Sequence, residues 1–288
     1  EPFEDTAMQD QITSFIGPGS QPGEEDGTTL DYMQMPSGMM TFATPDLPES
    51  EEAESFQAGM AALEQVLSQL QDYQEAEQGR MVSLLGLDPE NLNFVGQVLG
   101  EGEVSLIAGG VAQAQEAVLA GVWRVRETTD DGSILRDYVE IGAFPARILE
   151  TAFDVAQSEI AIPDSFGPNI FNAPPLLPEI NDQIPRVNGA GFTHVINLSL
   201  LPHTEEDLLF LNETLGRGAI TVLSRGYGNC RITATATRNV WWVQFYNSQD
   251  TMILNTVEIT HVPEVACASP EDIADSAERL DEILEIYR

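Results

Sequence analysis

The letters VWRV at residues 122–125 and VWWV at residues 240–243 decide the fold of this chain, because they mark two copies of one strand. Their offset is 118 residues. The same offset aligns further identical residues: VEI at 139–141 with VEI at 257–259, and Pro145 with Pro263. The sequence therefore predicts an internal repeat.

Further upstream the offset between the copies is 116 residues, because LGEG at 99–102 matches LGRG at 215–218. The change of two is even. Side chains alternate between the two faces of a strand, so an insertion of two residues in a hairpin leaves every later side chain on its original face. The shift in offset therefore favours strands over helices in the repeated part.

Each copy reads as a β-α-β-β-β-α unit. A short strand (81–85 or 194–200) precedes a helix that ends at Gly100 or Gly216, where glycine suits the left-handed end of a helix. The expected strands that follow are 103–108, 116–126 and 134–143 in the first copy, and 220–225, 231–246 and 252–262 in the second; the closing helices are 145–158 and the segment after Ser269. The predicted fold is α+β, with two pseudo-repeats, largely antiparallel sheets and helices on one face of each sheet. Periodicity does not decide whether the two sheets join.

Two segments lie outside the predicted repeats. Residues 1–79 are predicted to form an irregular acidic arm followed by an amphipathic helix, in which Phe56, Met60 and Leu63 begin an apolar stripe. The first repeat then occupies residues 80–160 and the second residues 193–288. Between them, residues 161–192 contain six prolines and read as a surface connector.

The charge balance excludes several classes of function. The chain has 47 acidic and 12 basic residues, a formal net charge of -35, so nucleic acid and anionic membranes are not expected partners. The acidic surface is either solvated or a docking face for a basic partner. All basic residues are arginines, which excludes a Walker phosphate loop, a lysine Schiff base and the common kinase mechanism. With no long apolar run or signal peptide visible, a cytoplasmic protein is expected.

Candidate catalytic and metal-binding groups are sparse. Cys230 and Cys267 stand far from each other and are expected to be free thiols, and the three histidines are scattered. Glu140 and Glu258 match between the copies, but each is expected to be an ordinary outward carboxylate of a strand. We therefore predict no catalytic residue, no cofactor and no metal site.

Two sets of residues are candidates for binding a protein. Arg124 and Arg126 point to one face of their strand, Trp123 and Trp241 belong to the core, and Trp242 lies on the face that carries Arg124 in the first copy. Trp and Arg are enriched in binding hot spots. A protein interface and cover by a helix both remain open for this face. Methionine adapts to irregular contacts, and the arm offers a second candidate set: Met33, Met35, Met39 and Met40.

Several of these stretches resemble a known family. LGEGEVS at 99–105 and GVWRVR at 121–126 are similar to signatures of the HupH/HyaF hydrogenase expression proteins, as are GYG at 226–228 and GPGSQP at 17–22. The likeness extends over nearly the whole chain. The motif residues are Gly17, Pro18, Gly19, Leu99, Gly100, Glu101, Gly102, Glu103, Trp123, Gly226, Tyr227 and Gly228.

The resemblance implies a chaperone-like accessory protein, not an enzyme, that helps to mature a nickel–iron uptake hydrogenase. Its partner would be the iron–sulfur small subunit precursor or other hydrogenase accessory proteins. The family supplies no established catalytic residue. Two alternatives stay open: a carrier of iron or an iron–sulfur cluster, disfavoured because only two thiolates are available, and a carboxylate-based metal-dependent enzyme.

Overall fold

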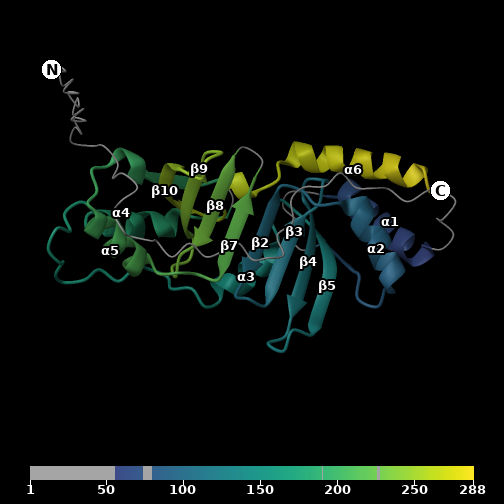
Figure 1. The fold of residues 1–288 in the computed structure, drawn as a ribbon, viewed down its shortest axis with the longest axis horizontal. Coiled ribbons are helices and arrows are strands. Elements are labelled where there is room, and N and C mark those ends of the chain that lie inside the picture. Colours follow the sequence, from purple (N-terminus) through teal and green to yellow (C-terminus); the bar gives the residue numbers. More distant parts are fainter. Residues whose placement is uncertain (1–55, 74–79, 190, 226–227) are drawn as a thin grey trace, which may run out of the picture. The chain divides into compact units, whose positions relative to one another are not determined.

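The computed structural model describes residues 56–73, 80–189, 191–225 and 228–288. Ten strands form a single sheet in the order β1-β5-β4-β3-β2-β7-β8-β9-β10-β6 (Figure 1), and every neighbouring pair is antiparallel. The strands are β1 (Arg80–Ser83), β2 (Val104–Ala108), β3 (Ala112–Glu116), β4 (Val122–Thr128), β5 (Ile134–Ile141), β6 (Thr193–Asn197), β7 (Ile220–Ser224), β8 (Asn229–Ala234), β9 (Val240–Tyr246) and β10 (Met252–Thr260).

Helices precede, interrupt and follow these strands. They are α1 (Gln57–Gln71), α2 (Pro89–Leu99), α3 (Ala146–Phe153), α4 (Leu176–Gln183), α5 (Glu205–Leu215) and α6 (Pro270–Glu285), with short 3-10 turns η2 (Ile184–Arg186), η3 (Leu198–Leu200) and η4 (Glu264–Ala266). The α+β class and the antiparallel pairing are confirmed. Among the helices in the described residues, none combines the length and apolar character that crossing a bilayer requires.

The repeat is visible in the centre of the sheet. Leu106 and Val222 are equivalent at the offset of 116, and they are also paired with each other across β2 and β7. A residue can face its own counterpart in this way only where a pseudo-twofold axis passes between the two. The buried tryptophan of each repeat makes an equivalent hydrogen bond: Trp123 Nε1 donates to Gly142 O at 3.0 Å, and Trp241 Nε1 donates to Thr260 O at 3.2 Å.

The predicted number of strands in each unit was wrong. Each repeat has four strands after its first helix, because the stretches expected as 116–126 and 231–246 are each broken by a turn. Gly121 (φ 76°) and Asn239 (φ 62°) reverse the chain at equivalent places with left-handed backbones. The side of the sheet that faces α3 is formed by even-numbered residues before each turn and by odd-numbered residues after it, since Ala114 packs with Trp123 and Ile232 packs with Trp241. The shift in offset falls in a hairpin: Ala108 pairs with Ala112, whereas Ser224 pairs with Cys230 two residues further on.

Helices cover both faces of the sheet, not one as predicted. Val122 belongs to a cluster with α1 and α2, whereas Trp123, which points the opposite way, packs with α3. A third cluster joins α4 and α5 to Val240 and Val257.

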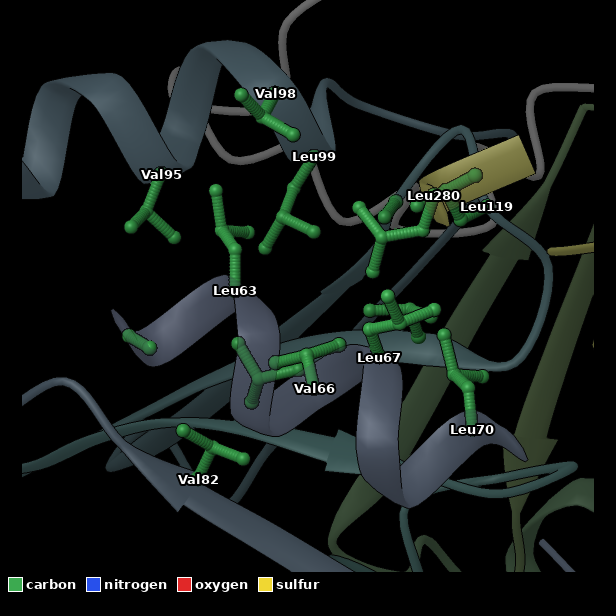
Figure 2. Packing of buried hydrophobic residues seen from close by; sticks show 14 of the residues in the cluster. Leu63, Val66, Leu67, Leu70, Val82, Val95, Val98, Leu99, Leu119 and Leu280 are labelled. Atoms are coloured by element: carbon green, nitrogen blue, oxygen red, sulfur yellow. The ribbon is translucent and has the colours of Figure 1, made fainter. Parts of the chain in front are cut away.

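The last helix crosses from the second repeat to the first. Ile273, Leu280 and Leu284 of α6 are buried in the same cluster as α1 and α2. Figure 2 shows the apolar side of α1 between Val95 and Leu99 of α2, Val82 of β1 and Leu280 of α6. The ion pair of Arg288 Nε with Glu64 Oε1, at 2.8 Å, also joins the chain's end to α1.

Two helical predictions need correction. The helix expected over 145–158 ends at Phe153, and the connector contains α4, which six prolines concealed. Leu177 and Ile180 of α4 are fully buried, so this segment is part of the core. The proposed boundaries at residues 80, 160 and 193 remain predictions.

Candidate functional site

Two rows of side chains cross the sheet on one face, since directly opposed residues of antiparallel strands point the same way. We call these rows the central face. The first row is Val139, Arg124, Gln115, Ser105, Leu223, Arg231, Gln244 and Asn255; the second is Asp137, Arg126, Gln113, Ile107, Thr221, Thr233, Trp242 and Val257. The register therefore places Arg124, Arg126 and Trp242 on one face of one continuous sheet.

The middle of the central face differs from the opposite side of the same strands. In β3, β2, β7 and β8, the opposite side contributes Leu106, Val222 and Ile232 to a buried cluster beneath α3. On the central face, none of the eight described side chains of these four strands belongs to a hydrophobic cluster. Most of them are polar and partly exposed. The face thus lies open between the clusters of α1 and α2 at one end and of α4 and α5 at the other, as far as the described residues extend.

At one end of this face, two guanidinium groups share one carboxylate. Asp137 Oδ2 accepts from Arg124 Nη2 at 3.2 Å and from Arg126 Nη2 at 3.1 Å. The Asp137 side chain is 4% exposed, whereas those of Arg124 and Arg126 are 27% and 38% exposed. One positive charge is left over at this end. It faces outward in a chain whose net charge is -35.

Trp242 stands at the other end of the face in an intermediate position. Its ring packs against the cluster of α4 and α5, and its Nε1 donates to Asn255 Oδ1. The indole is nevertheless only partly buried. The helical cluster therefore covers part of the ring while the rest of the side chain reaches the surface, and a role of Trp242 in binding a protein stays a prediction.

The arginines and Trp242 share a face but do not touch. β4 and β9 are separated by five steps between neighbouring strands, which at about 4.8 Å per step amounts to roughly 24 Å. Arg231 lies between the two ends, and its side chain makes no hydrogen bond or ion pair among the described residues. The face is therefore an extended surface with two arginines at one end and a tryptophan at the other.

The other predicted binding residues, the four methionines, have no described position. Met33, Met35, Met39 and Met40 fall outside the described residues, as do Gly17, Pro18, Gly19, Gly226 and Tyr227. Gly228 ends the loop before β8 with a φ of 102°.

The LGEG motif has a structural role in both repeats. Leu99 is buried, and Gly100 ends α2 with a φ of 59°. A Cβ on Gly102 would lie 2.2 Å from Ala117 O, because Gly102 N donates to Glu116 O. Gly216 and Gly218 repeat this arrangement, with a φ of 62° and a Cβ position 2.3 Å from Thr235 O. Glu101 is partly exposed and Glu103 is exposed. The two glycines therefore allow a helix to end directly against a turn of the sheet.

Two acids are more deeply buried than their sequence context indicated. The outward orientation predicted for Glu140 was wrong. Its side chain lies under α3, where Oε1 accepts from Ala146 N at 2.8 Å, and burial raises the pKa of its carboxyl. Its partner in the repeat, Glu258, is half-buried, and burial raises its pKa as well. Glu140 faces inward because the start of α3, not solvent, lies over that side of its strand.

The second acid, Glu116, was missed. Burial raises the pKa of Glu116 to about 7, although the hydrogen bond from Gly121 N to its Oε1 opposes this shift. The second repeat has Ala234 at the equivalent place. A difference between aligned copies is the signal that could have singled out this residue.

The cysteines lie in apolar surroundings. Cys230 is buried in the sheet and Cys267 is half-buried after η4, and both are free thiols. Burial raises the pKa of each thiol to about 12. Within the described residues, no three His, Cys, Asp or Glu side chains are grouped so as to hold a metal ion.

Comparison with known proteins supplies the family. The model of the "HupH hydrogenase expression protein, C-terminal conserved region" matches this chain twice, at residues 56–166 and 170–287. The chain belongs to the HupH hydrogenase expression protein family. The two matches begin at α1 and shortly before α4, so the family model describes one repeat at a time and includes these helices.

Named relatives of this HupH family member agree in length with it. "Hydrogenase expression/formation protein HoxQ" of Cupriavidus necator is 46% identical over 94% of this chain and 95% of its own length. "Hydrogenase expression/formation protein HupH" of Rhodobacter capsulatus is 45% identical over 95% and 96%. "Hydrogenase-1 operon protein HyaF" of Escherichia coli is 30% identical over 96% of each chain. These names support a role in hydrogenase maturation, as an accessory protein.

Proposed function

We propose that this protein is a non-catalytic, chaperone-like factor that acts in the cytoplasm during maturation of a nickel–iron uptake hydrogenase. We infer that it binds the iron–sulfur small subunit precursor, or another accessory protein of that hydrogenase, through the central face. The observation that carries this proposal is the open face between the two helical clusters, which has arginines at one end and Trp242 at the other.

The composition of the face supports protein recognition. Arg and Trp are the residues that most often anchor interfaces. The anchors are held before a partner arrives: Asp137 orients the two arginines, and Asn255 fixes the indole. Preorganised side chains lose less conformational entropy on binding. An extended, mostly polar face about 24 Å wide suits a folded partner better than a small molecule, for which a concave pocket is usual.

Co-purification of the tagged chain with the small subunit precursor tests this proposal. Trp242→Ala and Arg231→Ala should each weaken binding, because an interface anchor contributes about 2 kcal/mol, or roughly thirtyfold in affinity. Arg231 is preferred over Arg124 and Arg126, since its removal leaves no buried carboxylate unpaired.

Matched controls lie away from the face. Phe171→Ala removes an aromatic side chain that is 66% exposed in the connector, and Arg186→Ala removes an exposed arginine after α4. Both should bind as the unchanged chain does. If Trp242→Ala and Arg231→Ala stay folded and bind normally, the central face is not the interface. If the unchanged chain captures no hydrogenase component at all, the proposed partners are wrong.

A further inference from the structure

The two edges of the ten-stranded sheet, β1 and β6, are protected differently. At β1, the side chain of Gln69 in α1 reaches the edge, and its Nε2 donates to Met81 O at 3.4 Å. At β6, no hydrogen bond among the described residues reaches the outer side of the strand. An edge strand presents a row of backbone donors and acceptors that another strand can use.

The residues of β6 do not discourage such pairing. Edges are usually blunted by charged side chains, by proline or by a very short strand. The five residues of β6, THVIN, include no proline and no Lys, Arg, Asp or Glu. Its histidine is paired with a side chain of α4, since His194 Nε2 lies 2.8 Å from Glu179 Oε1.

Apolar side chains extend this border of the sheet. Val195 of β6 is 51% exposed, Leu200 of the adjoining η3 is 79% exposed, and Ile253, at the irregular start of β10, is 62% exposed. The hydrogen bond of Asn255 N with Ser199 Oγ, at 2.9 Å, fastens η3 beside β10 and so keeps these side chains on one border.

We propose that β6 binds an extended, neutral-to-basic segment of another protein, which adds to the sheet as an eleventh strand. The open backbone edge requires an extended occupant, because only a strand can satisfy alternating donors and acceptors along it. A second copy of this chain is disfavoured, since each copy has a net charge of -35. The Glu179 carboxylate beside the strand, with its side chain 42% exposed, also favours a basic segment.

Three labelled peptides test this inference with the full chain by fluorescence anisotropy. The first alternates valine and threonine and has arginine at both ends, the second has glutamate in place of arginine, and the third has proline at its centre. The arginine peptide should bind most tightly. Each of the other two should bind about tenfold more weakly, because one loses charge complementarity and the other loses backbone hydrogen bonds.

Hydrogen exchange and a pair of matched variants locate the binding. The amides of residues 193–197 should gain protection when the arginine peptide is added, while those of 80–83 should not. Val195→Arg should weaken binding about tenfold through like-charge repulsion at the edge, whereas Met81→Arg, on the other edge, should leave it unchanged. Equal binding of the three peptides, protection elsewhere than β6, or no binding of the arginine peptide at any reachable concentration would each overturn the proposal. The exchange measurement needs no variant, so a folding defect of Val195→Arg does not affect it.

Discussion

The first and second repeats have the same strand order around the pseudo-twofold axis. They differ in the side chain that accepts hydrogen bonds from the segment packed beside the first helix of the unit. At the third position of α2, Asn91 Oδ1 accepts from Gly59 N of α1 at 2.7 Å. At the same position of α5, Asp207 Oδ1 accepts from Phe171 N, Asn172 N and Ala173 N, at 2.8, 3.0 and 2.9 Å. Its other oxygen accepts from Thr204 N at 3.1 Å.

This difference follows from what each side chain must hold. Asn91 accepts from one amide in the first turn of a regular helix, whose amides from Met60 onward bond within the helix, so one acceptor is enough. Asp207 holds a stretch of the connector, residues 171–173, whose amides are not bonded within a helix; its Oδ1 accepts from all three, while its Oδ2 accepts from Thr204 N at the start of α5. The same fold position therefore carries an amide where the neighbour is regular and a charge where it is irregular.

Removing these two hydrogen-bond acceptors, Asp207 and Asn91, gives the largest expected effects on stability. Asp207→Ala leaves four backbone amides without their acceptor, of which Ala173 N is buried, and should lower the free energy of unfolding by roughly 3 to 5 kcal/mol, against roughly 1 to 3 kcal/mol for Asn91→Ala. Urea unfolding measures both, with the exposed Asp182→Ala as control. Equal losses for the two variants would contradict the comparison.

The same acid should make the protein sensitive to low pH. Burial by itself would raise the pKa of Asp207, but its four backbone donors hold it below the usual value. The stabilisation is therefore present above the unfolded pKa, about 4, and is lost as the pH falls through the folded pKa. Asp207→Asn should be less stable near pH 7 and lose less stability on acidification, as followed by unfolding at several pH values.

Glu116 gives the first repeat a pH dependence of the opposite sign, which Ala234 cannot give the second. Because burial raises the pKa of Glu116 from 4.5 to about 7, the folded protein holds a proton that the unfolded chain releases. Stability should fall by up to about 3 kcal/mol between about pH 4.5 and 7 and then level off. Glu116→Gln should remove this slope, and an unchanged slope in urea unfolding would assign it to another group.

Exchanging the turn residues of the two repeats gives a smaller effect. A Cβ on Gly121 would lie 2.4 Å from Ile273 Cγ1 of α6, which crosses this turn in the first repeat only. Gly121→Asn should therefore destabilise the protein by about 2 kcal/mol through overpacking. Asn239→Gly, the reverse exchange, should change thermal stability by less than about 1 kcal/mol. If both substitutions lower the stability equally, the crossing of α6 is not the reason for glycine at position 121.

The sequence by itself determined the repeat, the two core tryptophans, the glycines that end α2 and α5, and the shared orientation of Arg124 and Arg126. These features rest on local rules: alternation along a strand, the left-handed end of a helix, and an even shift in a hairpin. The resemblance to the HupH family followed from the same stretches. The face that carries Trp242 was also predictable, because it follows from the alignment of the two copies.

Only the tertiary structure decided how the repeats combine. The pairing of β2 with β7 depends on backbone hydrogen bonds, which any two strand edges can make and which leave no periodic trace in the side chains. The crossing of α6 onto α1 and the burial of Glu140 and Glu116 depend on segments far apart in the chain. Alternation indicates which side of a strand a residue faces, but what lies over that side is a property of the whole fold.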